Sequence, residues 1–170
     1  IAEQWGISQL DAARKLQPAG AIYQSISEDD MLRILAHPAA MIGSYGLPMD
    51  SRPHPRLWGT FPRVLGHYAR DQKRFPLAEA VAKMTTFPAR RFGFHDRGRI
   101  AVGMAADITV FDADTVADRA TFEKPVQLSA GIEEVFVNGV HSWSQGQGLE
   151  RAGGFLSHKT ITAKAVPAGE

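Results

Sequence analysis

Apolar positions in the first ninety residues recur mostly at the period of an α-helix. The pattern predicts helices over residues 8–17, 27–36, 63–71 and 76–87. Ser8 and Ser27 can cap the first two helices, because a serine hydroxyl accepts a hydrogen bond from a backbone N–H in the first turn. In the last helix, apolar residues from Leu77 to Met84 fall on one face, and Pro88 ends or kinks it.

Two short runs between these helices have the composition of buried strands. They are AIYQSI, residues 21–26, and AAMIGS, residues 39–44, and the helix of residues 27–36 joins them. A strand, a helix and a second strand in this order form a right-handed unit whose two strands are parallel. The sequence therefore predicts a parallel pair of strands.

A proline-rich stretch, SRPHPRLWGTFPR at residues 51–63, follows the second predicted strand. Four prolines lie between positions 48 and 62, which predicts a loop that is too rigid to be a disordered linker. Loops of this length in compact domains often carry functional groups. His54 is a candidate ligand contact in this loop, although a turn histidine bonded to backbone is the commoner arrangement.

Beyond residue 93 the pattern changes to short apolar runs separated by glycine. ITVF, residues 108–111, predicts a strand because β-branched and aromatic residues favour extended backbone. IEEVFVNGVHSW, residues 132–143, predicts a hairpin, since its residues alternate around Asn138-Gly139, a dipeptide preferred in type I′ turns. The carboxyl-terminal part is therefore expected to be a small β module.

The composition is typical of a globular chain. The 170 residues are 44% hydrophobic and 22% charged, with a formal net charge of +1, which gives no indication of nucleic-acid or membrane partners. The lack of cysteine excludes disulfides and thiolate metal ligands within these residues. No export signal is visible, which predicts a cytoplasmic location, and a first residue of Ile1 is expected for a trimmed chain or a fragment.

Two parallel strands cannot form a complete sheet, because parallel sheets contain several strands and are covered on both faces. We therefore expect an α/β fold in which residues 1–94 are the last βα units of an incomplete TIM-like (βα)8 barrel. Residues 95–156 are expected to form a small β-sandwich module, and residues 157–170 a flexible tail. Reactive groups of such barrels lie at the carboxyl ends of the strands, which here is Ser44-Tyr45. An ordinary turn with an exposed tyrosine is the alternative interpretation.

The spacing of residues along the sequence does not indicate a complete active site. The six histidines include no His-x-His or His-x-x-x-His pair, the common arrangements of metal ligands on strands and helices. The sequence also contains no nucleophile elbow, phosphate-binding glycine loop or dinucleotide fingerprint. Its chemistry alone predicts that the chain has no metal site of its own.

Four stretches carry unusual combinations of residues. They are GSYGLP from Gly43, HPRLWGTFPRVLG at residues 54–66, MTTFPARRFGF at residues 84–94 and DRGRIAVGMAADITVFD at residues 96–112. Together they resemble the D-aminoacylase (N-acyl-D-amino-acid deacylase) family, which belongs to the metal-dependent amidohydrolases. The second stretch is long and specific to that family, whereas the fourth resembles amidohydrolases in general.

The resemblance implies a βα-barrel flanked by a β-sandwich, and hydrolysis of an N-acyl-D-amino acid to a carboxylate and a free D-amino acid. In that family histidines and a cysteine on earlier strands hold zinc, which supplies a hydroxide nucleophile. An aspartate in a G-S-D-G pattern is the general base, and Tyr45 occupies the corresponding position here. The resemblance also implies substrate contacts at Ser44 and Arg56, with Arg63 as a further candidate. The alternative interpretation of both arginines is that they fix the loop by bonding backbone carbonyls.

Tyr45 changes what such a site can do. A carboxylate with a pKa of about 4 accepts a proton from metal-bound water, whereas a phenol with a pKa of about 10 mainly donates a hydrogen bond. We therefore expect the isolated chain to bind no zinc and to hydrolyse nothing. It is either the carboxyl-terminal part of a deacylase or a non-catalytic relic that acts as a binding or interaction module. The incomplete barrel also predicts self-association or pairing with a missing amino-terminal part.

Overall fold

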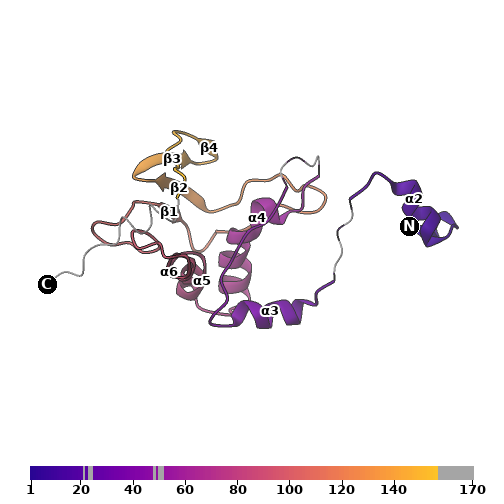
Figure 1. Ribbon diagram of the computed structural model, residues 1–170, viewed down its shortest axis with the longest axis horizontal. Helices are drawn as coiled ribbons and strands as arrows, with labels where there is room; N and C mark the ends of the chain where they lie inside the picture. The colour runs from indigo at the N-terminus through magenta and orange to yellow at the C-terminus, as the bar shows by residue number, and fades with distance from the viewer. Residues whose placement is uncertain (21, 23–24, 48, 50–51, 157–170) are drawn as a thin grey trace.

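The described part of the chain consists of short helices followed by one antiparallel sheet (Figure 1). The computed structural model describes residues 1–20, 22, 25–47, 49 and 52–156. Its helices are α1 (Ala2–Trp5), α2 (Gln9–Leu16), α3 (Glu28–Ala36), α4 (Arg56–Arg63), the π-helix η1 (Val64–Asp71), α5 (Leu77–Met84) and α6 (Thr86–Phe92). Its strands are β1 (Ile108–Phe111), β2 (Ile132–Val137), β3 (Val140–Ser144) and β4 (Gln147–Gly148). Within the described ranges no helix is both long and apolar enough to cross a bilayer.

Serine side chains begin α2 and α3, as predicted. The Ser8 hydroxyl accepts a hydrogen bond from the backbone N–H of Asp11 at 3.1 Å, and Ser27 accepts one from Asp30 at 3.2 Å. These bonds satisfy N–H groups that have no partner inside the helix. In Figure 1, α2 and the amino terminus lie apart from the other elements, and Leu10 of α2 is 60% exposed. Of the residues of α2 only Ala12 is buried, so local signals define this helix with little burial of its apolar face.

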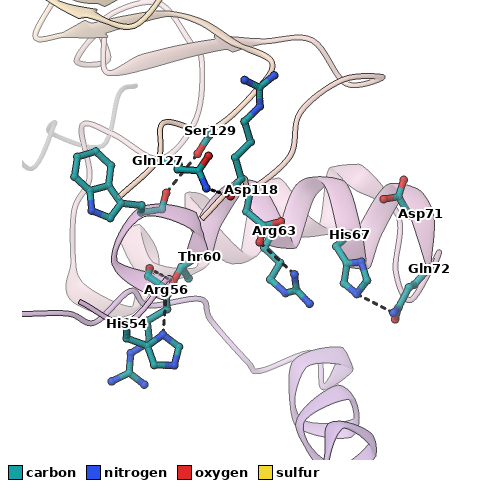
Figure 2. Close-up of polar contacts among 12 residues, drawn as sticks. His54, Arg56, Thr60, Arg63, His67, Asp71, Gln72, Asp118, Gln127 and Ser129 are labelled. Carbon is teal, nitrogen blue, oxygen red and sulfur yellow. Dashed lines mark hydrogen bonds and ion pairs between the residues drawn. The ribbon is translucent and has the colours of Figure 1, made fainter. Parts of the chain in front are cut away.

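A continuous helical segment, α4 and η1, replaces much of the loop predicted for residues 51–63. Pro62 lies inside α4 and has no N–H to donate to the Trp58 carbonyl one turn earlier. The Ser129 hydroxyl donates to that carbonyl instead, at an Oγ–O distance of 3.4 Å (Figure 2). The loop prediction was wrong because a partner 71 positions away in the sequence partly offsets the bond that proline removes.

The two other predicted helices of the first half are present with different details. Residues 63–71 are helical, but η1 has the wider hydrogen-bond register of a π-helix. The helix predicted from Pro76 is confirmed as α5, which ends at Met84 rather than at Pro88. Pro88 lies in the first turn of α6, where a missing N–H removes no bond inside the helix.

The core forms where α3, η1 and α5 meet the chain that follows β1. Its buried members are Leu32, Val64, Leu65, Tyr68, Ala69, Phe75, Ala80 and Val116. Gly66 allows this close packing, because a Cβ atom there would lie 2.2 Å from the Val116 carbonyl oxygen. Arg70 Nη1 donates to the same oxygen at 2.8 Å, so η1 is fixed to this part of the chain by packing and by a charged donor.

The predicted parallel pair of strands is not found among the residues that the structure describes. Residues 39–44 belong to no strand, and the sheet in the described part of the chain is antiparallel throughout. Of the other predicted strand, residues 21–26, positions 21, 23 and 24 lie outside the described residues. A parallel strand needs neighbouring strands, and residues 39–44 pair with none in the described part of the chain.

The sheet contains β1, β2, β3 and β4 in chain order. Its hairpin is confirmed, since Asn138 and Gly139 have φ angles of 50° and 81°, the positive values that a type I′ turn requires. Asp107, which immediately precedes β1, accepts a hydrogen bond from the Asn138 N–H at 2.8 Å and so fixes this turn beside the neighbouring strand. The described residues form one sheet, and the second layer of the expected sandwich is not found among them.

Candidate functional site

Residues 43–47 lie against the first turn of α4, and this contact joins two residues predicted for the site. The Nε of Arg56 donates to the backbone carbonyl oxygen of Tyr45 at 3.0 Å. The Cζ of the same guanidinium lies 4.9 Å from the centre of the Tyr45 ring, within cation–π range. Gly46 permits the approach, because a Cβ there would lie 2.5 Å from Leu57 Cδ1.

Both site residues remain accessible. The Tyr45 side chain and Ser44 are exposed, with Tyr45 at 64%, and Arg56 is exposed at the start of α4. A guanidinium has five N–H donors, of which the bond to the Tyr45 carbonyl uses one. Arg56 therefore keeps the chemical capacity to bind a carboxylate while it holds the backbone of Tyr45.

His54 lies beside Arg56 and helps to begin α4 (Figure 2). Its Nδ1 accepts a hydrogen bond from the Arg56 backbone N–H at 3.0 Å, and its ring meets the edge of Phe122 with 5.2 Å between centroids. Burial, followed by the charge of Arg56, lowers the pKa of His54, so the imidazole is neutral at pH 7. The interpretation of His54 as a turn histidine bonded to backbone is thus confirmed.

Arg63, the second arginine candidate, contacts Asp118 at the other end of α4. Its Nη1 lies 3.2 Å from Asp118 Oδ2, and its Cζ lies 5.5 Å from the centre of the Tyr68 ring. Burial opposes the charge of Arg63, but the hydrogen bond with Tyr68 and the charge of Asp118 outweigh it and raise the pKa of the guanidinium. In this arrangement Arg63 ties α4 to the chain between β1 and β2.

Lys83 is a buried charged residue near the site that the sequence did not single out. Its side chain is 0% exposed, and its Nζ donates to the His37 carbonyl oxygen at 2.7 Å. The Lys83 backbone carbonyl accepts a hydrogen bond from the N–H of Ile42 at 3.1 Å. Lys83 therefore contacts the segment that leads to Ser44 through both its side chain and its backbone. No local sequence pattern predicts that a lysine near the end of an amphipathic helix is buried.

A groove of about 770 Å³ lies between α5, α6, β1 and the loop that precedes β1. The apolar residues that line it include Phe61, Val81, Met84, Ile108, Phe111 and Ile132. Neither Tyr45 nor Arg56 is among its lining residues. The contact between Tyr45 and Arg56 is therefore separate from this groove.

The described residues do not fit a zinc site, since no three histidine, aspartate or glutamate side chains among them are placed to hold a metal ion. Several imidazoles also have other partners. His54 Nδ1 accepts from the Arg56 N–H, and His67 Nε2 lies 2.9 Å from the Gln72 side-chain amide (Figure 2). His158 lies outside the described residues.

Known proteins that are similar over most of this chain include deacylases. The chain matches the amidohydrolase family over residues 12–142. It is 53% identical over 165 residues to N-acyl-D-glutamate deacylase of Alcaligenes xylosoxydans xylosoxydans, a match that covers 97% of this chain and 34% of the relative. It is 57% identical over 145 residues to D-aminoacylase of the same organism, covering 85% of this chain and 30% of the relative.

Solved structures with the same fold are also deacylases. A crystal structure of D-aminoacylase matches with a TM-score of 0.81 and 54% identity, over 88% of this chain and 32% of that one. N-acyl-D-glutamate deacylase from Bordetella bronchiseptica, complexed with zinc and a phosphonate mimic of the tetrahedral intermediate, matches with a TM-score of 0.79 and 54% identity, over 86% and 31%. The chain spans about a third of the length of these relatives. The resemblance to D-aminoacylases is thus confirmed, and the chain belongs to the amidohydrolase family.

Proposed function

We propose that this chain is the carboxyl-terminal portion of a zinc-dependent hydrolase that cleaves the amide bond of N-acyl-D-amino acids. The observation that carries the proposal is the 53% identity to an N-acyl-D-glutamate deacylase over 97% of the chain. In this proposal residues 1–94 complete a βα-barrel, and residues 95–156 supply one layer of a β-sandwich. Residues 157–170, predicted as a tail, lie outside the described residues.

Arg56 and Ser44 are the residues proposed to contact the substrate. The N–H donors of the Arg56 guanidinium other than Nε–H suit the carboxylate of an N-acyl-D-amino acid, because guanidinium and carboxylate form paired, charge-assisted hydrogen bonds. Ser44 precedes Tyr45 on the same exposed turn and offers a hydroxyl. Zinc polarises the amide carbonyl in such hydrolases, and its ligands would belong to a part of the protein that precedes these residues.

Tyr45 is proposed to leave this hydrolase without its general base. The phenol donates a hydrogen bond but does not accept the proton that a carboxylate would take, and loss of a general base costs about 10²- to 10⁴-fold in rate. A second candidate, a non-catalytic binding module, is favoured by the engagement of Arg56 with the carbonyl and ring of Tyr45. That contact already occupies part of the guanidinium that a substrate would need.

Substitution of Tyr45 in the longest natural form of the protein tests the proposal. Hydrolysis of N-acetyl-D-glutamate and of an apolar N-acetyl-D-amino acid would be followed by release of the free amino acid. We expect Tyr45→Asp to raise kcat by about 10²- to 10⁴-fold. Tyr45→Asn, which has the size of aspartate without its charge, and Tyr45→Phe, which keeps the ring, should give no gain.

Two outcomes would contradict parts of the proposal. Equal rates for the original protein and Tyr45→Asp would refute the loss of the general base. Absence of hydrolysis in every variant, together with no His-x-His strand before Ile1 in the encoded protein, would support the binding module instead.

A further inference from the structure

We propose that Lys83 is a positioning residue for the candidate site. Its ammonium and its backbone carbonyl together fix residues 37–42 on α5 and thereby place the Ser44-Tyr45 turn that follows. The claim that this turn is a substrate site rests on the proposed function, whereas the claim that Lys83 holds it rests on the contacts described below.

The Lys83 ammonium has an acceptor for each of its three N–H donors. The Nζ atom donates to the carbonyl oxygens of His37 at 2.7 Å and of Ala40 at 3.5 Å, and it lies 3.3 Å from Glu79 Oε1. It also lies 5.9 Å from the centre of the Phe75 ring. A lysine removed from water is costly unless its charge is paired and hydrogen-bonded, and this set of partners meets that requirement.

The partners of Lys83 explain why it is buried. An ion pair with Glu79 one turn earlier on α5 could form equally well at the surface, where Lys15, Lys73 and Lys124 lie. The ammonium instead reaches the His37 carbonyl, which belongs to the residue that caps the carboxyl end of α3. Carbonyls at that end have no partner within the helix and carry partial negative charge, so a cation stabilises them.

The segment that enters the site is therefore held at both ends by cations from other helices. Lys83 holds its beginning through the carbonyls of His37 and Ala40, and Lys83 O accepts from Ile42 N at 3.1 Å. Arg56 holds its end through the Tyr45 carbonyl. Since residues 39–44 have no β-ladder, these contacts fix the course of the chain past α5 to α4.

Chemical labelling of the folded protein tests the burial of this ammonium without any substitution. The protein would be acetylated with a limiting amount of an N-hydroxysuccinimide ester, and each lysine would be quantified by peptide mass spectrometry. We expect Lys83 to react at least about tenfold more slowly than the exposed Lys15, Lys73 and Lys124. Labelling of Lys83 at the rate of these three lysines would overturn the proposal.

Hydrogen exchange in Lys83→Met tests the positioning itself, since methionine keeps the length and packing of the side chain but has no donor. We expect the exchange rates of the backbone amides in residues 39–46 to rise on the order of 10- to 100-fold, because hydrogen bonds to a charged group are lost. Exchange rates in the hairpin of residues 132–144 should be unchanged. Glu79→Gln is the matched control. It keeps an acceptor at the ammonium, removes only the charge, and should leave exchange in residues 39–46 within about threefold of the original.

Equal acceleration of exchange in residues 39–46 and in the hairpin would show that Lys83 contributes only to global stability, and would overturn the positioning role. If Glu79→Gln and Lys83→Met accelerate exchange in residues 39–46 equally, the acceleration comes from the ion pair on α5 and not from the carbonyls of His37 and Ala40. That result would also overturn the positioning role of Lys83. None of these measurements requires catalysis. A failure of the proposed hydrolase activity is therefore distinguishable from a failure of this inference.

Discussion

The hairpin of β2 and β3 and the segment of residues 37–45 are held in opposite ways. The backbone of the hairpin pairs with residues a few positions away, beginning with Val137 opposite Val140. Residues 37–45 take their fixed contacts from two helices, through Lys83 of α5 and Arg56 of α4. The hairpin therefore carries its own partners, whereas the shape of the candidate site depends on side chains supplied from elsewhere in the chain.

This difference determines how each region responds to substitution. The hairpin should respond mainly to changes in its turn, its strands or the neighbouring β1, because the ladder between β2 and β3 is local. The site segment should respond to single changes on α4 and α5, and to any change that separates these helices. Three predictions test this contrast beyond the substitutions of Tyr45 and Lys83.

The largest effect on stability is expected for Gly66→Ala, which disturbs the packing of η1 against Val116. A Cβ atom at Gly66 would lie 2.2 Å from the Val116 carbonyl oxygen, so η1 must move away from the core. We expect the free energy of unfolding to fall by about 2 to 3 kcal/mol, measured by urea denaturation with tryptophan fluorescence. Gly43→Ala is the control, since the space around Gly43 is open. Equal urea midpoints for Gly66→Ala and Gly43→Ala would contradict the close contact.

A smaller loss of stability is expected for Gly139→Ala, which strains the backbone of the hairpin and leaves the contacts of residues 37–45 unchanged. The φ angle of Gly139 is 81°, and a side chain in that region of backbone conformation costs about 1 to 2 kcal/mol. Hydrogen exchange should rise in residues 132–144 and stay unchanged in residues 39–46. Gly148→Ala, in open space within β4, should change neither. Faster exchange at residues 39–46 would show that the two regions are coupled.

The smallest expected effect is the pH dependence of the contribution that His54 makes to stability. Burial and the charge of Arg56 lower its pKa in the folded protein below the ordinary value of 6.5. As pH falls below about 6.5 the unfolded chain takes up this proton first, so the contribution of His54 to stability is present above that pH and is lost as pH falls through the folded pKa. An NMR titration of the ring should give a pKa below 6.5, closer to 6.5 in Arg56→Gln. A His54 pKa at or above 6.5 in the unsubstituted protein would contradict the partly buried position of the ring beside Arg56.

Residues that act on near neighbours were predictable from the sequence, and those that act over long distances were not. Ser8 and Ser27 cap their helices through bonds within one turn, and Asn138 begins a turn that is also local. The helix α4 was missed because Pro62 forbids it locally, and the compensating Ser129 is remote in sequence. Residues 39–44 have the composition of a strand, but pairing requires a neighbouring strand that local composition does not provide.

The residues of the candidate site also differ in how far the sequence could predict them. The family resemblance singled out Tyr45 and Arg56, and the structure brings them into contact. Their roles toward a substrate, and that of Ser44, stay predictions, as does the cytoplasmic location. Lys83 was missed because its importance depends on carbonyls at the end of α3, which no pattern around residue 83 reveals.

The dependence of α4 and η1 on the later chain has a consequence for biosynthesis. Their fixing partners are Ser129 for the Trp58 carbonyl and the Val116 carbonyl for Arg70. During translation the helical segment leaves the ribosome before either partner has been made. The helical segment that begins with Arg56 is therefore fixed in its final surroundings only after residues 116 and 129 have emerged, so a ribosome that stalls early releases a product in which this segment lacks both partners.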